Sequence, residues 1–127
     1  MEKEEVLSTA RSLREAYFPK RHQVGDCTDI CLGIGSLLKH EKGLKVQMVY
    51  GQVNDCHHTW LSVEGVDVDV STDCTYELDL PFVVMADHDG YIVTSRDPLE
   101  LSDFVPLSWE QYRELYLIEK HLGADNG

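Results

Sequence analysis

The chain has 127 residues, 43% of them hydrophobic and 27% charged, which suits a single globular domain with one buried core. Its 23 Asp and Glu residues outnumber the 11 Lys and Arg residues and give a net charge of -12. No basic patch for nucleic acid is visible, and anionic membrane surfaces would repel this charge. We therefore expect one domain over residues 1–127 with neutral or basic partners, and neither nucleic acid nor membrane among them.

The N-terminal sequence and the cysteines indicate the cellular compartment in which the protein is expected. The first ten residues, MEKEEVLSTA, lack the basic and apolar regions of a secretory signal. The longest apolar run, at 80–86, is too short to span a bilayer. Without a signal, a disulfide framework is not expected, and we predict a cytoplasmic protein with reduced thiols. These thiols belong to Cys27, Cys31, Cys56 and Cys74.

The first third of the chain predicts two helices. Apolar residues recur at helical spacing over residues 2–17. A second helix is expected over about residues 27–41, with Asp26 as its N-cap and Gly43 as its C-cap. Gly33 and Gly35 inside this helix cost about 1 kcal/mol each relative to Ala. Such glycines are tolerable where another part of the chain must approach closely, as when a helix packs onto a sheet.

Strand patterns follow. Residues 44–53 alternate as a strand, and 54–56 (NDC) form a turn. Residues 58–71 predict a hairpin that turns at Glu64–Gly65. Residues 82–95 predict a second hairpin, with Asp89–Gly90 as its type I′ turn.

The C-terminal part predicts a third helix. Ser108 and Gln111 form a capping box, Leu107 and Tyr112 are placed to staple the helix start, and Gly123 ends it. The predicted order is two helices, four or five antiparallel strands and one helix, which is an α+β domain.

The first hairpin places unusual residues on one face. Strand surfaces are depleted in Asp, yet Asp67 and Asp69 share a face on the returning strand, while His58 and Trp60 share a face on the outgoing strand. A two-residue turn pairs Trp60 with Asp69 and places Asp69 diagonal to His58; a shift by one residue places them directly opposite. In either register Asp69 is the better partner for His58.

A histidine oriented by a carboxylate needs a nucleophile, and Cys27 has the best position for one. It stands in the first turn of a predicted helix, where free N–H groups and the helix dipole favour a thiolate. The same N–H groups could receive the oxyanion of a tetrahedral intermediate. Cys31, one turn further along, is expected in the core.

These three elements, in this order, resemble the transglutaminase-like branch of the papain-type cysteine enzymes. The family has Gly-x-Cys at a helix start, His-Ala-Trp on a strand and an Asp on the next strand. GDC at 25–27, HTW at 58–60 and VDVDVS at 66–71 match them. The resemblance covers residues 23–72, somewhat under half the chain. Thr28 and His57 depart from the family pattern, and the chain could hold only the minimal core.

The resemblance implies a papain-like fold in which a catalytic helix packs on an antiparallel sheet. It implies acyl transfer or amide hydrolysis through a thioester, with Cys27, His58 and Asp69 as the triad and a peptide or protein amide as substrate. Gln23 would donate to the oxyanion and Trp60 would contact the substrate. No cofactor and no metal are expected.

Other interpretations stay open. Cys27 could be a small buried hydrophobe, and the protein could be a catalytically silent, acidic binding module on the same fold. A zinc-stabilised domain is a further alternative, with ligands drawn from the four cysteines together with His57 and His58. Against zinc, no CxxC pair occurs. His57, on the face opposite to His58, is assigned to structure, and the polar residues around Asp89–Gly90 to a turn.

Overall fold

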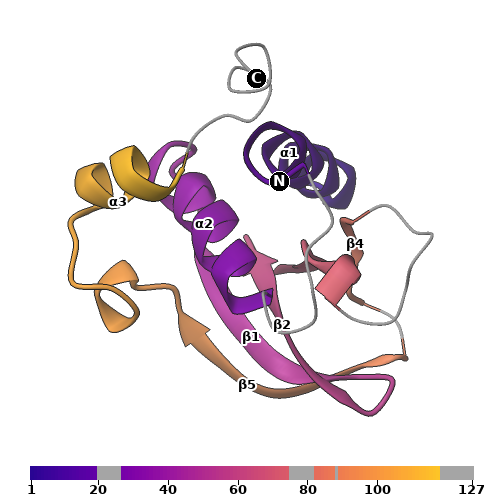
Figure 1. The fold of residues 1–127 in the computed structure, drawn as a ribbon. Coiled ribbons are helices and arrows are strands. Elements are labelled where there is room, and N and C mark those ends of the chain that lie inside the picture. Colours follow the sequence, from indigo (N-terminus) through magenta and orange to yellow (C-terminus); the bar gives the residue numbers. More distant parts are fainter. Residues whose placement is uncertain (20–26, 75–81, 88, 118–127) are drawn as a thin grey trace.

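The computed structural model describes residues 1–19, 27–74, 82–87 and 89–117. In Figure 1 the helices lie together on one side of a sheet, and α2 runs over β1 and β2. Among the described residues, no helix has the length and apolar character needed to cross a membrane. The helices are α1 (Lys3–Tyr17), α2 (Cys27–His40) and α3 (Trp109–Tyr116), and the strands are β1 (Val46–Val53), β2 (Cys56–Val63), β3 (Val66–Asp69), β4 (Val84–Met85) and β5 (Tyr91–Pro98).

The strands form one antiparallel sheet with the order β4-β3-β2-β1-β5. Short 3-10 turns follow β3 at Thr72–Cys74 and β5 at Leu101–Asp103. The predicted α+β class is therefore confirmed, as are the bounds of the first two helices to within a residue or two.

The β2–β3 hairpin has the predicted two-residue turn. Glu64 and Gly65 both have positive φ, 51° and 80°, as a type I′ turn requires. Val63 pairs with Val66, and Ser62 pairs with Asp67. This register carries Asp69 to the position diagonal to His58.

The second predicted hairpin is wrong. β4 pairs with β3 and β5 pairs with β1, so these two strands lie at opposite edges of the sheet. β4 has only two residues, whereas β5 pairs along nearly the whole of β1, from Pro98 opposite Gln47 to Tyr91 opposite Val53. The long pairing supplies far more backbone hydrogen bonds than a local hairpin on a two-residue strand could. The Asp89–Gly90 turn therefore leads into β5 and does not close a hairpin.

The β1–β2 connection is tighter than the sequence suggested. Asn54 and Asp55 have φ of 51° and 67°, a conformation these residues tolerate, and they complete the turn alone. Cys56 therefore belongs to β2, opposite Val53, and not to the turn.

The last helix begins as predicted and ends early. Ser108 and Gln111 form the capping box, with Gln111 N–H donating to Ser108 Oγ and Ser108 N–H donating to Gln111 Oε1. The helix ends at Tyr116, because Leu117 is extended and buried against a small core with Tyr112. The predicted end at Gly123 lies outside the described residues.

Close packing of α2 on the sheet explains its internal glycines. A Cβ added to Gly35 would lie 2.3 Å from a methyl carbon of Leu99 and 3.2 Å from one of Leu61. The predicted close approach is thus present. The main core lies between the helices and the sheet and includes Cys31, which has no exposed surface, as expected from its place on the helix.

A buried ion pair joins α1 to the 3-10 turn that follows β3. Arg14 Nη1 and Nη2 donate to the two carboxylate oxygens of Asp73 at 2.9 and 2.6 Å, and Nη1 also donates to the carbonyl of Val70 at 2.8 Å. The side chains of Arg14 and Asp73 are 2% and 0% exposed. This bidentate clamp fixes the chain immediately after Asp69.

Replacement of Arg14 by Met should lower the free energy of unfolding by about 3–5 kcal/mol, because Asp73 would keep a buried charge without its cation. Arg96 forms a similar bidentate pair with Asp67 at the surface, where its side chain is 38% exposed. Arg96→Met is therefore the matched control and should cost about 0–1 kcal/mol. Urea unfolding measures both, and equal losses would contradict the role given to the clamp.

Candidate active site

The start of α2 brings Cys27 to His58. Cys27 is the first residue of the helix and is half-buried, and it lines the same hollow as His58 and Thr59 of β2. His58 lies close enough to act on the pKa of the thiol, and Thr59 adds to its effect. Cys31 is turned away from this contact and donates to the Thr59 carbonyl at 3.4 Å.

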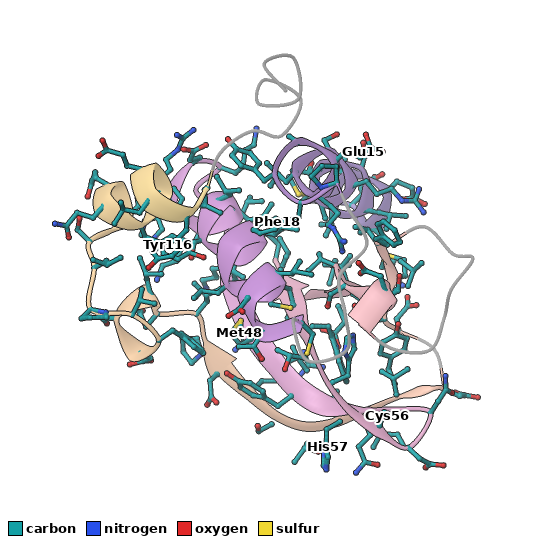
Figure 2. The ribbon with its side chains drawn as sticks, viewed as in Figure 1. Glu15, Phe18, Met48, Cys56, His57 and Tyr116 are labelled. Atoms are coloured by element: carbon teal, nitrogen blue, oxygen red, sulfur yellow. The ribbon has the colours of Figure 1, made fainter. Side chains whose placement is uncertain are left out.

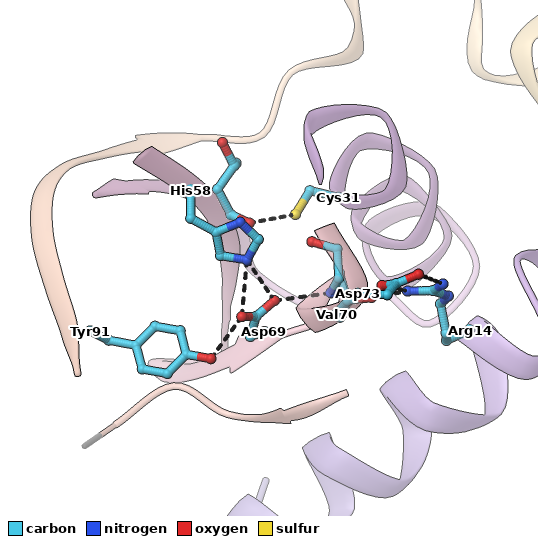
Figure 3. Close-up of polar contacts among 9 residues, drawn as sticks. Arg14, Cys31, His58, Asp69, Val70, Asp73 and Tyr91 are labelled. Atoms are coloured by element: carbon cyan, nitrogen blue, oxygen red, sulfur yellow. Dashed lines mark hydrogen bonds and ion pairs between the residues drawn. The ribbon is translucent and has the colours of Figure 1, made fainter. Parts of the chain in front are cut away.

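His58 is held from its other side by Asp69. Its Nε2 lies 3.0 Å from both carboxylate oxygens of Asp69, and each of the two side chains is only 1% exposed (Figure 3). Because Asp69 occupies Nε2, the ring nitrogen left for the thiol of Cys27 is Nδ1. The predicted partnership of His58 with Asp69 is therefore present in the structure, in the register that the two-residue turn sets.

Asp69 receives two further hydrogen bonds. The backbone N–H of Ser71 donates to Oδ1 at 2.9 Å, and the hydroxyl of Tyr91 donates to Oδ2 at 2.7 Å. Asp69 is almost wholly buried, so these protein donors and His58 take the place of water around the carboxylate.

The surroundings of Cys27 and His58 favour the charged forms of both side chains, a thiolate and an imidazolium. Burial raises the pKa of the Cys27 thiol, but the hydrogen bond and charge of His58, with help from Thr59, bring it below its ordinary value. Burial lowers the pKa of His58, but hydrogen bonds to Asp69 and Cys27 outweigh burial and raise the pKa to about 9. Near neutral pH the histidine is thus an imidazolium, and the arrangement favours a thiolate beside it.

Cys27 and His58 lie at the wall of a hollow of about 350 Å³. A β-bulge shapes one wall, because the β1–β5 register shifts between Tyr50 and Gly51 and leaves Thr94 as the extra residue. Bulges commonly redirect side chains next to active sites. The hollow is lined by Cys27, Thr28, Tyr50, Gly51, His57, His58, Thr59 and Thr94.

The part predicted for Trp60 needs correction here. Trp60 has no exposed surface and packs edge-on to Tyr91, with 5.1 Å between the ring centroids, so it supports the site from beneath and cannot touch a substrate. His57, assigned to structure from the sequence, is an exposed residue of β2 (Figure 2). It is also one of the residues that line the hollow. Gln23, the predicted oxyanion donor, lies outside the described residues.

The zinc alternative finds no support in the part of the chain that is described. There, no three side chains of His, Cys, Asp and Glu gather in a group suited to a metal ion. Of its proposed ligands, Cys31 is buried in the core, whereas His57 faces the hollow.

Comparison with protein-family models, with curated proteins and with solved structures finds no match to this chain. The resemblance to transglutaminase-like enzymes therefore remains a prediction from the three sequence motifs.

Iodoacetamide at about pH 6 should alkylate Cys27 well before Cys56, because the pKa of Cys27 is lowered while a free thiol titrates at about 8.5. Cys56 is also partly exposed and so serves as an internal control. His58→Ala should slow alkylation of Cys27, since the effect of burial, which raises the pKa of the thiol, would then lose its main opposing contribution. Peptide mass spectrometry measures both sites, and equal labelling that ignores His58 would show that no thiolate–imidazolium pair forms.

Proposed function

We propose that this protein is a cysteine enzyme that transfers or hydrolyses acyl groups through a thioester, on a papain-like, transglutaminase-like fold. The observation that carries the proposal is the contact of Cys27 with a buried His58 that Asp69 holds by Nε2, at the edge of an open hollow. A thiol, an imidazole and a carboxylate in series are the parts that nucleophilic acyl chemistry needs.

Each side chain has a defined part in the reaction. The Cys27 thiolate attacks the carbonyl carbon, and the tetrahedral intermediate collapses to a thioester as the leaving amine takes a proton from the His58 imidazolium. Water or an amine then attacks the thioester and gives its proton to His58, and the Cys27 thiolate leaves. Asp69 fixes the orientation of the ring throughout and stabilises its positive charge whenever the ring is protonated.

The oxyanion has donors at the same helix end. The first N–H groups of an α-helix have no intrahelical acceptor, and those at the start of α2 lie next to the sulfur that forms the new bond. The sequence predicts Gln23 as a further donor.

The substrate that fits best is an amide of a peptide or of a protein side chain, such as that of Gln. The lining of the hollow is mostly uncharged, with hydroxyl groups from Thr28, Thr59 and Thr94. The net charge of -12 favours neutral or basic substrates over acidic ones. This chemistry needs no cofactor.

Acyl transfer can be tested with an activated ester, p-nitrophenyl acetate. The protein should take up one acetyl group on Cys27, seen by intact mass and peptide mapping, and should release it faster when an amine is added. Cys27→Ala should abolish this reaction, whereas Cys56→Ala should leave it unchanged. Acetylation spread over several cysteines, or unaffected by Cys27→Ala, would favour the silent binding module instead.

The two aspartates of β3 form a matched pair of variants. Asp69→Asn should slow turnover of the ester by about 10²–10⁴-fold, because it removes the group that orients His58. Asp67→Asn should have little effect, since Asp67 pairs with Arg96 at the surface. The alkaline limb of the pH–rate profile should lie near the His58 pKa of about 9 and move down in Asp69→Asn. Equal losses from the two variants would contradict the assignment.

A further inference from the structure

Tyr91 reaches the site from the far edge of the sheet. β1 and β2 lie between its strand, β5, and the strand of Asp69, β3, so the contact is made across the face of the sheet that carries Trp60. The ring of Tyr91 stands edge-on to the indole of Trp60 at an interplanar angle of 80°. Its hydroxyl donates to Oδ2 of Asp69 at 2.7 Å. Figure 3 shows Tyr91 reaching Asp69.

The hydrogen bonds of Asp69 divide between its two oxygens. Ser71 N–H binds Oδ1 and Tyr91 O–H binds Oδ2, while His58 Nε2 lies equally far, 3.0 Å, from both. A donor on each oxygen prevents the carboxylate from rotating away from the imidazole. Each donor also withdraws charge that the carboxylate would otherwise offer to His58.

We infer that Tyr91 is a positioning residue for His58 and Asp69. It holds the Asp69 carboxylate in the plane of the His58 ring and weakens the attraction between that carboxylate and the imidazolium. This inference rests on the proposed function and deepens it. Tyr91 itself does not line the hollow and touches no reacting atom. It acts through Asp69, and so its removal should change how His58 titrates as well as how fast Cys27 reacts.

The charged and titratable groups around the pair are few among the described residues. His58 faces Cys27 from α2 and Asp69 from β3, and Asp69 faces Tyr91 from β5. His57 lines the same hollow. Further along the chain, after Ser71, Asp73 forms an ion pair with Arg14, and the two charges neutralise each other.

Tyr91→Phe keeps the ring against Trp60 and removes only the hydroxyl. We expect acetylation of Cys27 to slow by up to about 10-fold, as for one lost hydrogen bond. We also expect the alkaline limb of the pH–rate profile to move to higher pH. Asp69 loses a competing hydrogen-bond donor, so it stabilises the protonated form of His58 more strongly. Tyr112→Phe, which alters a buried tyrosine of α3 away from the site, is the control and should change neither quantity.

The His58 titration, followed by NMR of the imidazole, gives a second readout that needs no activity. Its pKa should rise in Tyr91→Phe, and it should fall when Tyr91 alone is replaced by 3-fluorotyrosine, whose more acidic hydroxyl is a stronger donor. An unchanged pKa in both proteins, or shifts in the opposite directions, would overturn the inference. Failure of the proposed function would look different, because wild-type Cys27 would then show no acetylation that depends on His58.

Discussion

The hydrogen-bonded pair of His58 and Asp69 is the interaction on which the site depends. Both side chains are almost wholly buried, and a buried charge is costly unless hydrogen bonds and an opposite charge compensate it. The compensation here comes from separate parts of the fold. The Glu64–Gly65 turn sets the register of β2 and β3, and the chain after β3 supplies the Ser71 N–H. The fold around His58 and Asp69 thus supplies the hydrogen bonds that allow these two side chains to be charged while buried.

The helix adds the nucleophile to this pair by close packing. Gly35 allows α2 to lie against Leu99 and Leu61, and the first residue of the same helix then meets His58. Burial alone would make Cys27 an unreactive thiol. The neighbouring imidazolium reverses this effect on its pKa, so the reactivity of Cys27 is a property of the β2–β3 hairpin as much as of its own helix.

Local signals predicted the parts of the fold that short segments determine. The alternation of β2 and β3 and their two-residue turn indicated that His58 and Asp69 would meet, and Ser108 with Gln111 indicated the start of α3. The pairing of β5 with β1 depends on residues far apart in the sequence, which a local Asp-Gly turn signal could not reveal. Tyr91 was missed as a site residue for that reason, because its contact with Asp69 exists only once β5 lies at the opposite edge from β4.

The most direct measurement is the titration of Cys27 itself, followed by NMR of protein with ¹³C-labelled cysteine, in the wild type and in His58→Ala. If the thiol is activated by His58, its pKa in the wild type lies below the ordinary value for a thiol, about 8.5, and rises in the variant, where His58 no longer offsets burial. A wild-type pKa for Cys27 at or above about 8.5, unchanged by His58→Ala, would contradict the thiolate–imidazolium pair and with it the proposed enzyme.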